Sequence, residues 1–246
     1  MDWLTDLHCH ILPYVDDGAE NLDEALELLR FQRQQNVGCV VLTPHSRTRL
    51  FETEDSVIFK QFQRLCREAE RLGEMPELLL GREYFCDGTM MERAARQRLC
   101  TLGGGDTLLI EFSGRHTFGL ACQRVKRLSE LGYRPLIAHV ERYFWVQEQP
   151  ERLFELAGLG AQIQVNAGSV LGEQGWRQKR FCRRLMEQDL VDIIASDCHR
   201  TQWRSPNLGI CRAYVERKMG RDYAHRIFCS NPAKLLSNRR RSKESW

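Results

Sequence analysis

Short apolar runs alternate with longer segments of helical periodicity along nearly the whole chain. Seven of the runs have the length and composition of buried strands, and they cover residues 4–8, 38–43, 78–82, 107–111, 135–139, 161–166 and 191–196. The amphipathic segments predict helices over residues 21–36, 56–73, 119–132, 150–158, 177–189, 207–218 and 223–230, with Asn231 and Pro232 opening a short last turn. Strand–helix alternation favours a parallel sheet, and seven such units in about 250 residues fit an α/β protein with one closed β/α barrel.

A doubly wound open sheet is the other arrangement that this alternation allows. Neither of its phosphate-binding signatures, GxGxxG or GxxxxGK[ST], follows any of the predicted strands. The glycines at 103–105 stand before a strand, where they predict a turn and no phosphate loop. The barrel is therefore the favoured fold.

Six of the seven predicted strands end in residues that bind metals. The set comprises His8 and His10 with Asp16 and Asp17 beyond them, His45, Glu83, Glu111, His139 with Glu141, and Asp197 with His199. Five of the seven histidines fall at these ends, and His116 and His225 are left as ordinary polar residues. In a β/α barrel the carboxyl ends of the strands gather on one rim, which is where active sites lie.

So many imidazoles and carboxylates on one rim need cations to satisfy them. Imidazole and carboxylate without thiolate suit Mn, Fe or Zn, and the number of ligands predicts two or three ions. Strand alternation points Cys9 and Cys198 away from this cluster, so we interpret both as small buried spacers.

Composition and charge exclude several other classes. The net charge of +3 is too small to indicate a nucleic-acid partner or a membrane surface. No apolar stretch reaches the roughly 18 residues of a membrane span, and no signal peptide is expected. The ten cysteines form no CxxC pair, which indicates reduced thiols in a cytoplasmic protein.

One literal motif favours different chemistry. Cys198 and Arg204 have the Cys-x5-Arg spacing of cysteine-dependent tyrosine phosphatases. Such a loop wraps backbone N–H groups around phosphate and needs small residues, whereas this one holds Trp203 and no glycine. The cysteine mechanism is therefore the weaker interpretation.

The ordered segments DLHCHILPYVDDGA, TPHS, GREY, LLIEF, IAHVERY, QVNAGSVLG, SDCHR and NP resemble the PHP (polymerase and histidinol phosphatase) superfamily. Within it they are similar to the capsule-locus protein-tyrosine phosphatases of the CpsB/CapC type. The resemblance implies a distorted seven-stranded TIM-like barrel, here a PHP domain over residues 1–237. The basic tail 238–246 is expected to be disordered. A Ser at position 46, where many relatives have a second His, departs from the pattern.

The resemblance also implies a metal centre with two or three ions, usually manganese. By position, one ion is held by His8, His10, Glu83 and Asp197, a second by Glu83, His45 and His139, and a third by Asp17, Glu111 and His199. Arg142 and Arg204 match the arginines that bind the substrate phosphate. A metal-bound hydroxide is expected to attack phosphorus, with no phosphoenzyme.

The implied substrate is phosphotyrosine on the C-terminal tyrosine cluster of a partner bacterial tyrosine kinase, in a system that regulates capsular or exopolysaccharide synthesis. One alternative, a phosphatase of a small phosphomonoester such as histidinol phosphate, shares every metal ligand. A second, a non-catalytic protein that binds the phosphorylated tail, would need broken ligands, and none is missing here. The sequence leaves the oligomeric state open.

Overall fold

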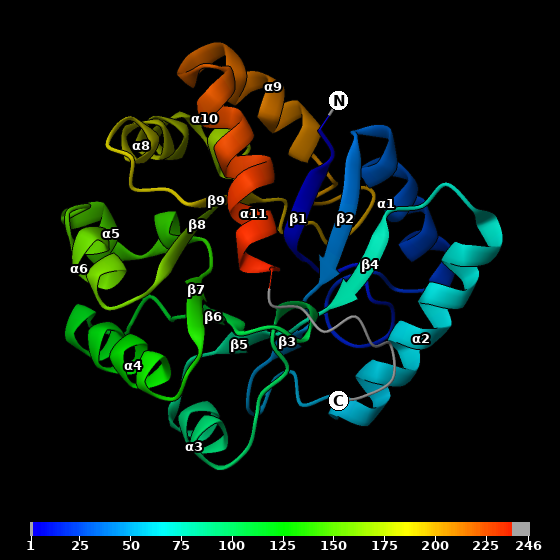
Figure 1. Cartoon of the computed structure of the whole chain (residues 1–246), viewed down its shortest axis with the longest axis horizontal. Coiled ribbons are helices and arrows are strands. Elements are labelled where there is room, and N and C mark those ends of the chain that lie inside the picture. The colour runs from blue at the N-terminus through cyan, green and yellow to red at the C-terminus, as the bar shows by residue number, and fades with distance from the viewer. Residues whose placement is uncertain (1, 238–246) are drawn as a thin grey trace.

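Parallel strands and surrounding helices account for most of the chain in a computed structural model, which describes residues 2–237 (Figure 1). The strands are β1 (Leu4–Cys9), β2 (Val37–Leu42), β3 (His45–Ser46), β4 (Glu77–Leu80), β5 (Glu83–Phe85), β6 (Thr107–Glu111), β7 (Arg134–Ile137), β8 (Gln162–Asn166) and β9 (Ile193–Ala195). They form two parallel sheets, ordered β1-β2-β4 and β3-β5-β6-β7-β8-β9.

The two sheets are parts of one ring of seven strand positions. Pro44 separates β2 from β3, because proline cannot donate to a strand ladder, and Gly81 with Arg82 separates β4 from β5. Hydrogen bonds from Gly81 to the Leu42 carbonyl (2.8 Å) and from Glu83 to the Pro44 carbonyl (3.2 Å) carry the pairing across both breaks.

The end of β1 closes the ring against the residues that follow β9. Cys9 and Cys198 form a parallel bridge, and the N–H of His10 donates to the Cys198 carbonyl at 2.8 Å. The predicted distorted β/α barrel is therefore confirmed. Two of the predicted strands are each divided into two shorter ones, and the hydrophobic periodicity of the sequence does not reveal these breaks.

Helices cover the outside of this ring. They are α1 (Leu22–Gln34), α2 (Asp55–Leu72), α3 (Gly88–Arg96), α4 (Phe118–Glu130), α5 (Phe144–Glu148), α6 (Arg152–Gly158), α7 (Ala167–Leu171), α8 (Trp176–Glu187), α9 (Leu208–Met219), α10 (Arg221–His225) and α11 (Asn231–Leu235). Side chains cap several of them, as Asn21 does by accepting from the N–H of Glu24 at 2.9 Å.

The sequence missed α3, α5 and α7. The last two are five residues long, which is too short to show a helical period. The helical segment expected at 223–230 is confirmed, with a change of helix type, because α10 ends at His225 and a π-helical turn spans Arg226–Ser230. The tail predicted at 238–246 lies outside the described residues.

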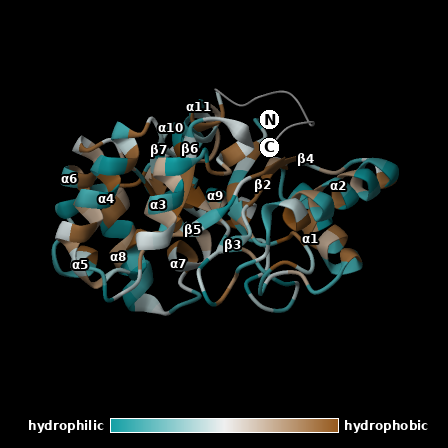
Figure 2. Ribbon diagram, turned by 90° about the horizontal axis from the view of Figure 1, so that it is seen from below, coloured by the Kyte–Doolittle hydropathy of each residue, from teal (hydrophilic) through white to brown (hydrophobic). Residues whose placement is uncertain are grey.

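Apolar side chains fill the interior of the barrel, and polar groups stand at the rim where the carboxyl ends of the strands meet. The inner cluster comprises Leu7, Val41, Leu102, Leu109, Leu136, Ala138, Ile193, Ala195, Leu235 and Leu236. The last two lie at the end of α11, the last helix of the described residues, which lies across the ring in Figure 1. Figure 2 shows helices whose surfaces alternate between hydrophobic and hydrophilic sides, as expected for helices that pack on a sheet. Within the described residues no helix is long and apolar enough to cross a membrane.

Candidate metal centre

Nine predicted ligands lie in the strands or in the segments that follow them, and His45 and Glu83 begin β3 and β5, the short continuations of β2 and β4. His8 is on β1, His45 on β3, Glu83 on β5 and Glu111 on β6, while the others follow β1, β7 and β9. The structure brings the ligand atoms of eight of them into three groups, each within 4.8 Å: His8 with His10 and Asp197, His45 with Glu83 and Glu111, and His10 with Asp17, His45 and His199. The ninth, His139, lies 2.9 Å from Oε1 of Glu83.

His8 and His10 have their metal-binding nitrogens fixed by partners behind the rings. Nδ1 of His8 lies 2.9 Å from Oε1 of Gln164, and Nδ1 of His10 lies 2.7 Å from Oδ2 of Asp16. Both Nδ1 atoms therefore donate, and both Nε2 atoms are left with lone pairs. These two Nε2 atoms face each other at 3.2 Å, an arrangement that requires a cation or a proton between them.

Glu83 gives the clearest sign of missing positive charge. Its Oε2 atom is buried and makes no hydrogen bond. It lies 3.3 Å from Nε2 of His8, 3.3 Å from Nε2 of His10 and 2.8 Å from Nδ1 of His45. Three imidazoles around one unpaired carboxylate oxygen fit an oxygen that bridges metal ions.

The two ring nitrogens of His45 face different carboxylates. Its Nδ1 atom lies 2.8 Å from Oε2 of Glu83, and its Nε2 atom lies 3.6 Å from Asp17. His139 lies 2.9 Å from Oε1 of Glu83, so His45 and His139 both contact this carboxylate. Nε2 of His199 lies 3.7 Å from the same oxygen of Asp17 that His45 approaches. Glu111 is more distant from its neighbours, at 3.9 Å from His45 and 3.8 Å from His139.

The two predicted phosphate-binding arginines meet at one carboxylate. Nη2 of Arg142 donates to Oδ2 of Asp197 at 3.0 Å, and Nη2 of Arg204 donates to the same oxygen. Asn166 also donates to it at 2.5 Å. Asp197 therefore touches the His8 and His10 group with one oxygen and anchors both guanidinium groups with the other.

Backbone conformation aims several of these side chains. His139, Asp197 and Arg204 have φ values of 36°, 52° and 55°, in the left-handed region that side chains other than glycine rarely adopt. Left-handed residues end the strands abruptly and turn the following side chains toward the rim. Such strain is typical of functional sites.

The electrostatics divide the histidines into two kinds. Burial opposes charge on His8 and His45, but the carboxylate of Glu83 raises the pKa of His8 to about 9 and that of His45 to about 10. Burial and Arg142 lower the pKa of His139 to about 4, and burial and His10 lower that of His199 to about 2. In the absence of metal, protons on His8 and His45 supply the positive charge that the carboxylates need.

The carboxyl group of Glu111 is pushed toward neutrality. Burial, and then the carboxylate of Glu83, raise the pKa of Glu111 to about 7. Burial also opposes charge on Glu83, yet His8 and His45 hold the pKa of that carboxyl well below its usual range. A cation beside Glu111 would favour its charged form.

Residues behind the ligands were missed by the sequence analysis. The sequence places Asp16 among residues of metal-binding types, whereas in the structure its carboxylate accepts from His10 and, at 3.0 Å, from the N–H of His45. Gln164 and Asn166 were not considered. Both lie on one face of β8, where polar residues alternate with apolar ones in QIQVN. Polar residues facing into a barrel that is buried on both sides are a signal that could have found them.

The structure also shows where Cys198 and His225 lie. The Cys198 thiol is fully buried and lies beside Asp6, Cys9 and Gln32 of α1, on the other side of its strand end from the metal cluster. This placement rules out a nucleophile aimed at phosphate. His225 makes an ordinary ion pair with Asp2 at 3.1 Å.

The fit of the donor set to metal ions is good. The nine ligands offer imidazole nitrogens and carboxylate oxygens, bare lone pairs converge, and the histidines at β1 are oriented from behind. Such donors suit Mn, Fe or Zn and exceed the needs of one ion.

Known proteins with this sequence pattern have the same fold. Tyrosine-protein phosphatase CpsB of Streptococcus agalactiae is 32% identical over 240 residues, which are 96% of this chain and 99% of CpsB. Tyrosine-protein phosphatase YwqE of Bacillus subtilis is 30% identical over 235 residues, covering 96% of this chain and 92% of YwqE. A solved structure of the metal-dependent tyrosine phosphatases YwqE from Bacillus subtilis and CpsB from Streptococcus pneumoniae superposes with a TM-score of 0.89, at 30% identity and 96% coverage of both chains.

A more distant barrel, the phosphotriesterase homology protein of Escherichia coli, superposes with a TM-score of 0.63 at 10% identity, which shows a shared fold alone. Residues 4–237 match the family described as capsular polysaccharide synthesis, CpsB/CapC. The matched region includes every predicted ligand and both arginines. On this match, and on its identity to CpsB and YwqE over nearly the whole length, the chain belongs to the CpsB/CapC family.

Proposed function

We propose that this protein is a metal-dependent protein-tyrosine phosphatase, a phosphoric monoester hydrolase that acts on phosphotyrosine. The observation that carries the proposal is the junction at Asp197, whose carboxylate links the imidazoles of the metal centre to Arg142 and Arg204. A phosphate placed there would meet both metals and guanidinium groups. The activity of the relatives CpsB and YwqE supports the same reaction.

Two or three ions, manganese first and iron or zinc as alternatives, would be held by the nine ligands. His8, His10, Glu83 and Asp197 would bind one of them, Glu83, His45 and His139 another, and Asp17, Glu111 and His199 a third. When bound, such ions lower the pKa of water and neutralise charge on phosphoryl oxygens.

The chain's own residues then bind and orient the substrate. Arg142 and Arg204 present planar groups of donors that match phosphate oxygens, and their charge stabilises the transition state. Asn166 keeps the Asp197 carboxylate in place while the arginines turn to the substrate. A phenolate leaving group has a pKa near 10, so hydrolysis does not depend on a general acid.

The exposure of the site supports a substrate presented on a polypeptide. Side chains at the mouth remain open to solvent, with 47% of Asp17 and 40% of Arg142 exposed. We extend the proposal to the C-terminal phosphotyrosine cluster of a bacterial tyrosine kinase, in the control of capsular or exopolysaccharide synthesis. The ten free cysteines support a reducing, cytoplasmic location.

Metal removal and replacement test the reaction. The protein is stripped with EDTA, supplied with Mn²⁺, Zn²⁺ or buffer, and assayed for phosphate release from a phosphotyrosine peptide and from histidinol phosphate. We expect Mn²⁺ to restore release from the peptide, with little from histidinol phosphate. Release mainly from histidinol phosphate would move the proposal to a small phosphomonoester, and activity that ignores EDTA would overturn the metal mechanism.

The kinase substrate needs a separate test. A tyrosine-phosphorylated bacterial kinase and the same kinase without its C-terminal tyrosine cluster are incubated with the metal-loaded protein. The proposal expects rapid loss of phosphate from the cluster. Equal rates on phosphotyrosines elsewhere in the kinase would restrict the proposal to phosphotyrosine in general.

A further inference from the structure

The indole of Trp203 stands at the mouth of the centre, against two of its functional residues. Its ring lies edge-on to the His199 ring, with centroids 5.4 Å apart and an interplanar angle of 78°. The guanidinium carbon of Arg204 lies 5.3 Å from the Trp203 ring centroid. Even so, 55% of Trp203 is exposed. A large apolar surface is thus held open beside the groups proposed to bind phosphate.

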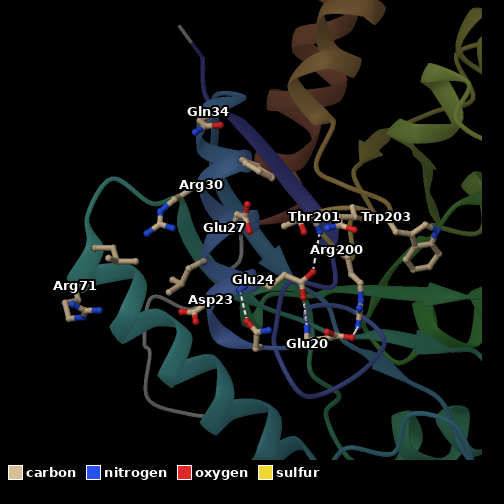
Figure 3. Close-up of a pocket in the computed structure, with 15 residues that line it drawn as sticks. Glu20, Asp23, Glu24, Glu27, Arg30, Gln34, Arg71, Arg200, Thr201 and Trp203 are labelled. Carbon is tan, nitrogen blue, oxygen red and sulfur yellow. Dashed lines mark hydrogen bonds and ion pairs between the residues drawn. The ribbon is translucent and has the colours of Figure 1, made fainter.

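The segment that carries Trp203 is a closed turn. The N–H of His199 donates to the Arg204 carbonyl at 2.9 Å, and the N–H of Arg200 donates to the Trp203 carbonyl at 3.1 Å. Arg200 also pairs with Glu20 at 2.6 Å, which ties the turn to the residues before α1 (Figure 3). In the same view the Trp203 indole projects away from α1. The turn therefore keeps the ring in one place without covering it.

The described residues contain other exposed aromatic side chains, which differ from Trp203 in their neighbours. They are Trp3, Tyr14, Phe144, Phe154 and Trp176. In the described part of the chain, Trp203 is the one exposed aromatic ring with a ring or cation contact to both a predicted metal ligand and a predicted phosphate-binding arginine.

We propose that Trp203 binds the aromatic ring of the substrate and determines the preference for aryl phosphates. This inference rests on the proposed function. A phenyl ring is joined to phosphorus through a single ester oxygen, so a phosphate held at Arg204 places that ring beside the indole. Aromatic pairs attract at centroid distances of about 4.5–7 Å, and the exposed part of Trp203 supplies the partner surface. Because the turn is already held by hydrogen bonds, the Trp203 side chain loses little conformational freedom when the substrate binds.

Trp203→Ala tests this role in the metal-loaded protein, with free phosphotyrosine as substrate and inorganic phosphate as competitive inhibitor. We expect kcat/KM for phosphotyrosine to fall about three- to tenfold, which is the range of one aromatic pair. The inhibition constant of inorganic phosphate should change less than twofold, because phosphate has no ring to lose. Trp203→Phe should recover most of the loss.

A matched control is Phe154→Ala, which removes an aromatic ring of 58% exposure from α6 on the outside of the barrel. It should leave both constants unchanged. An equal weakening of phosphotyrosine and inorganic phosphate by Trp203→Ala would show that Trp203 only positions Arg204 and His199, and would overturn the proposal. No change in either constant would overturn it as well. If the unmodified, metal-loaded protein fails to hydrolyse phosphotyrosine, the proposed function fails first, before any variant is compared.

Discussion

Arg204 donates from Nη1 to Nε2 of His199 at 3.0 Å, so a proposed phosphate-binding group covers the lone pair of a proposed metal ligand. Nδ1 of His199 lies 3.0 Å from the Asp197 carbonyl, which makes Nε2 the bare nitrogen. A cation at His199 would displace the guanidinium. Metal binding and the position of Arg204 are therefore coupled.

Arg204→Ala should separate the two roles. We expect kcat/KM for phosphotyrosine to fall about 10²–10³-fold, the cost of losing a charged donor to the transition state. Affinity for Mn²⁺ should rise about two- to tenfold, because a neighbouring positive charge and a competitor for His199 are both removed. Metal titration and steady-state kinetics measure the two effects.

A control for Arg204→Ala is Arg64→Ala, which removes an exposed arginine of α2. It should change neither quantity. Loss of Mn²⁺ in parallel with activity would contradict the coupling, because it would make Arg204 a support for the metal centre.

Asp16→Asn should weaken metal binding although Asp16 is not among the nine ligands. Its carboxylate accepts from Nδ1 of His10 and from the N–H of His45, and so orients two ligands at once. Loss of the charge makes His10 a poorer donor to metal, at a cost of about 10–100-fold in affinity. Equilibrium dialysis against Mn²⁺ measures this. Asp23→Asn, on the outer turn of α1, is the control, and equal affinity for Mn²⁺ in both variants would refute the role of Asp16.

The sequence predicted the barrel well because two independent patterns agreed. Apolar runs gave the strand positions, and metal-binding residue types gathered at the end of nearly every run. In a parallel barrel those ends share one rim, so His8 and Asp197 could be placed together although they are 189 residues apart in the sequence. The metal-binding residue types at the strand ends therefore supported the strand assignments where the local apolar pattern was weak.

Contacts between neighbouring loops could not be predicted from the sequence in this way. The position of His45 between Glu83 and Asp17 depends on which strand ends are neighbours across the barrel mouth and on side-chain direction. The role of Trp203 depends on a turn closed by backbone hydrogen bonds and on the left-handed Arg204. Neither feature follows a period of 2 or 3.6 residues, so the hydrophobic pattern of the sequence does not predict it.

Metal binding should release protons. The pKa values of about 9 for His8 and about 10 for His45 mean that both are protonated at pH 7.5 in the metal-free protein. Ligation needs bare nitrogens, so the protons on His8 and His45 leave as the centre fills. Against burial and His45, the carboxylate of Asp16 raises the pKa of His10 as well, which favours release of a proton there too. His139 and His199 have lowered pKa values and contribute none. Glu111, with a pKa of about 7, adds a further proton when the pH falls below 7.

The sign of the pH dependence follows from these directions. Apparent affinity for Mn²⁺ should increase from pH 6 to about pH 9 and level off above pH 10, where His8 and His45 have already lost their protons. Calorimetric titrations at pH 7.5 in two buffers of different ionisation enthalpy count the protons. Identical heats in the two buffers would show that no protons are released and would contradict protonation of these histidines.

Cys198→Ala should leave catalysis intact. The thiol is fully buried, and its sulfur lies 3.7 Å from Nε2 of Gln32, beneath α1 and facing away from the arginines. Removing a buried sulfur leaves a small cavity, so the free energy of unfolding should decrease by about 1–2 kcal/mol. The kcat for phosphotyrosine should stay within twofold, and thiol alkylation of the native protein should not inactivate it. His199→Ala, one residue further on, is the contrasting variant and should lose both metal and activity. Abolished turnover in Cys198→Ala with full metal content, together with inactivation by thiol alkylation, would instead support the thiol as the nucleophile.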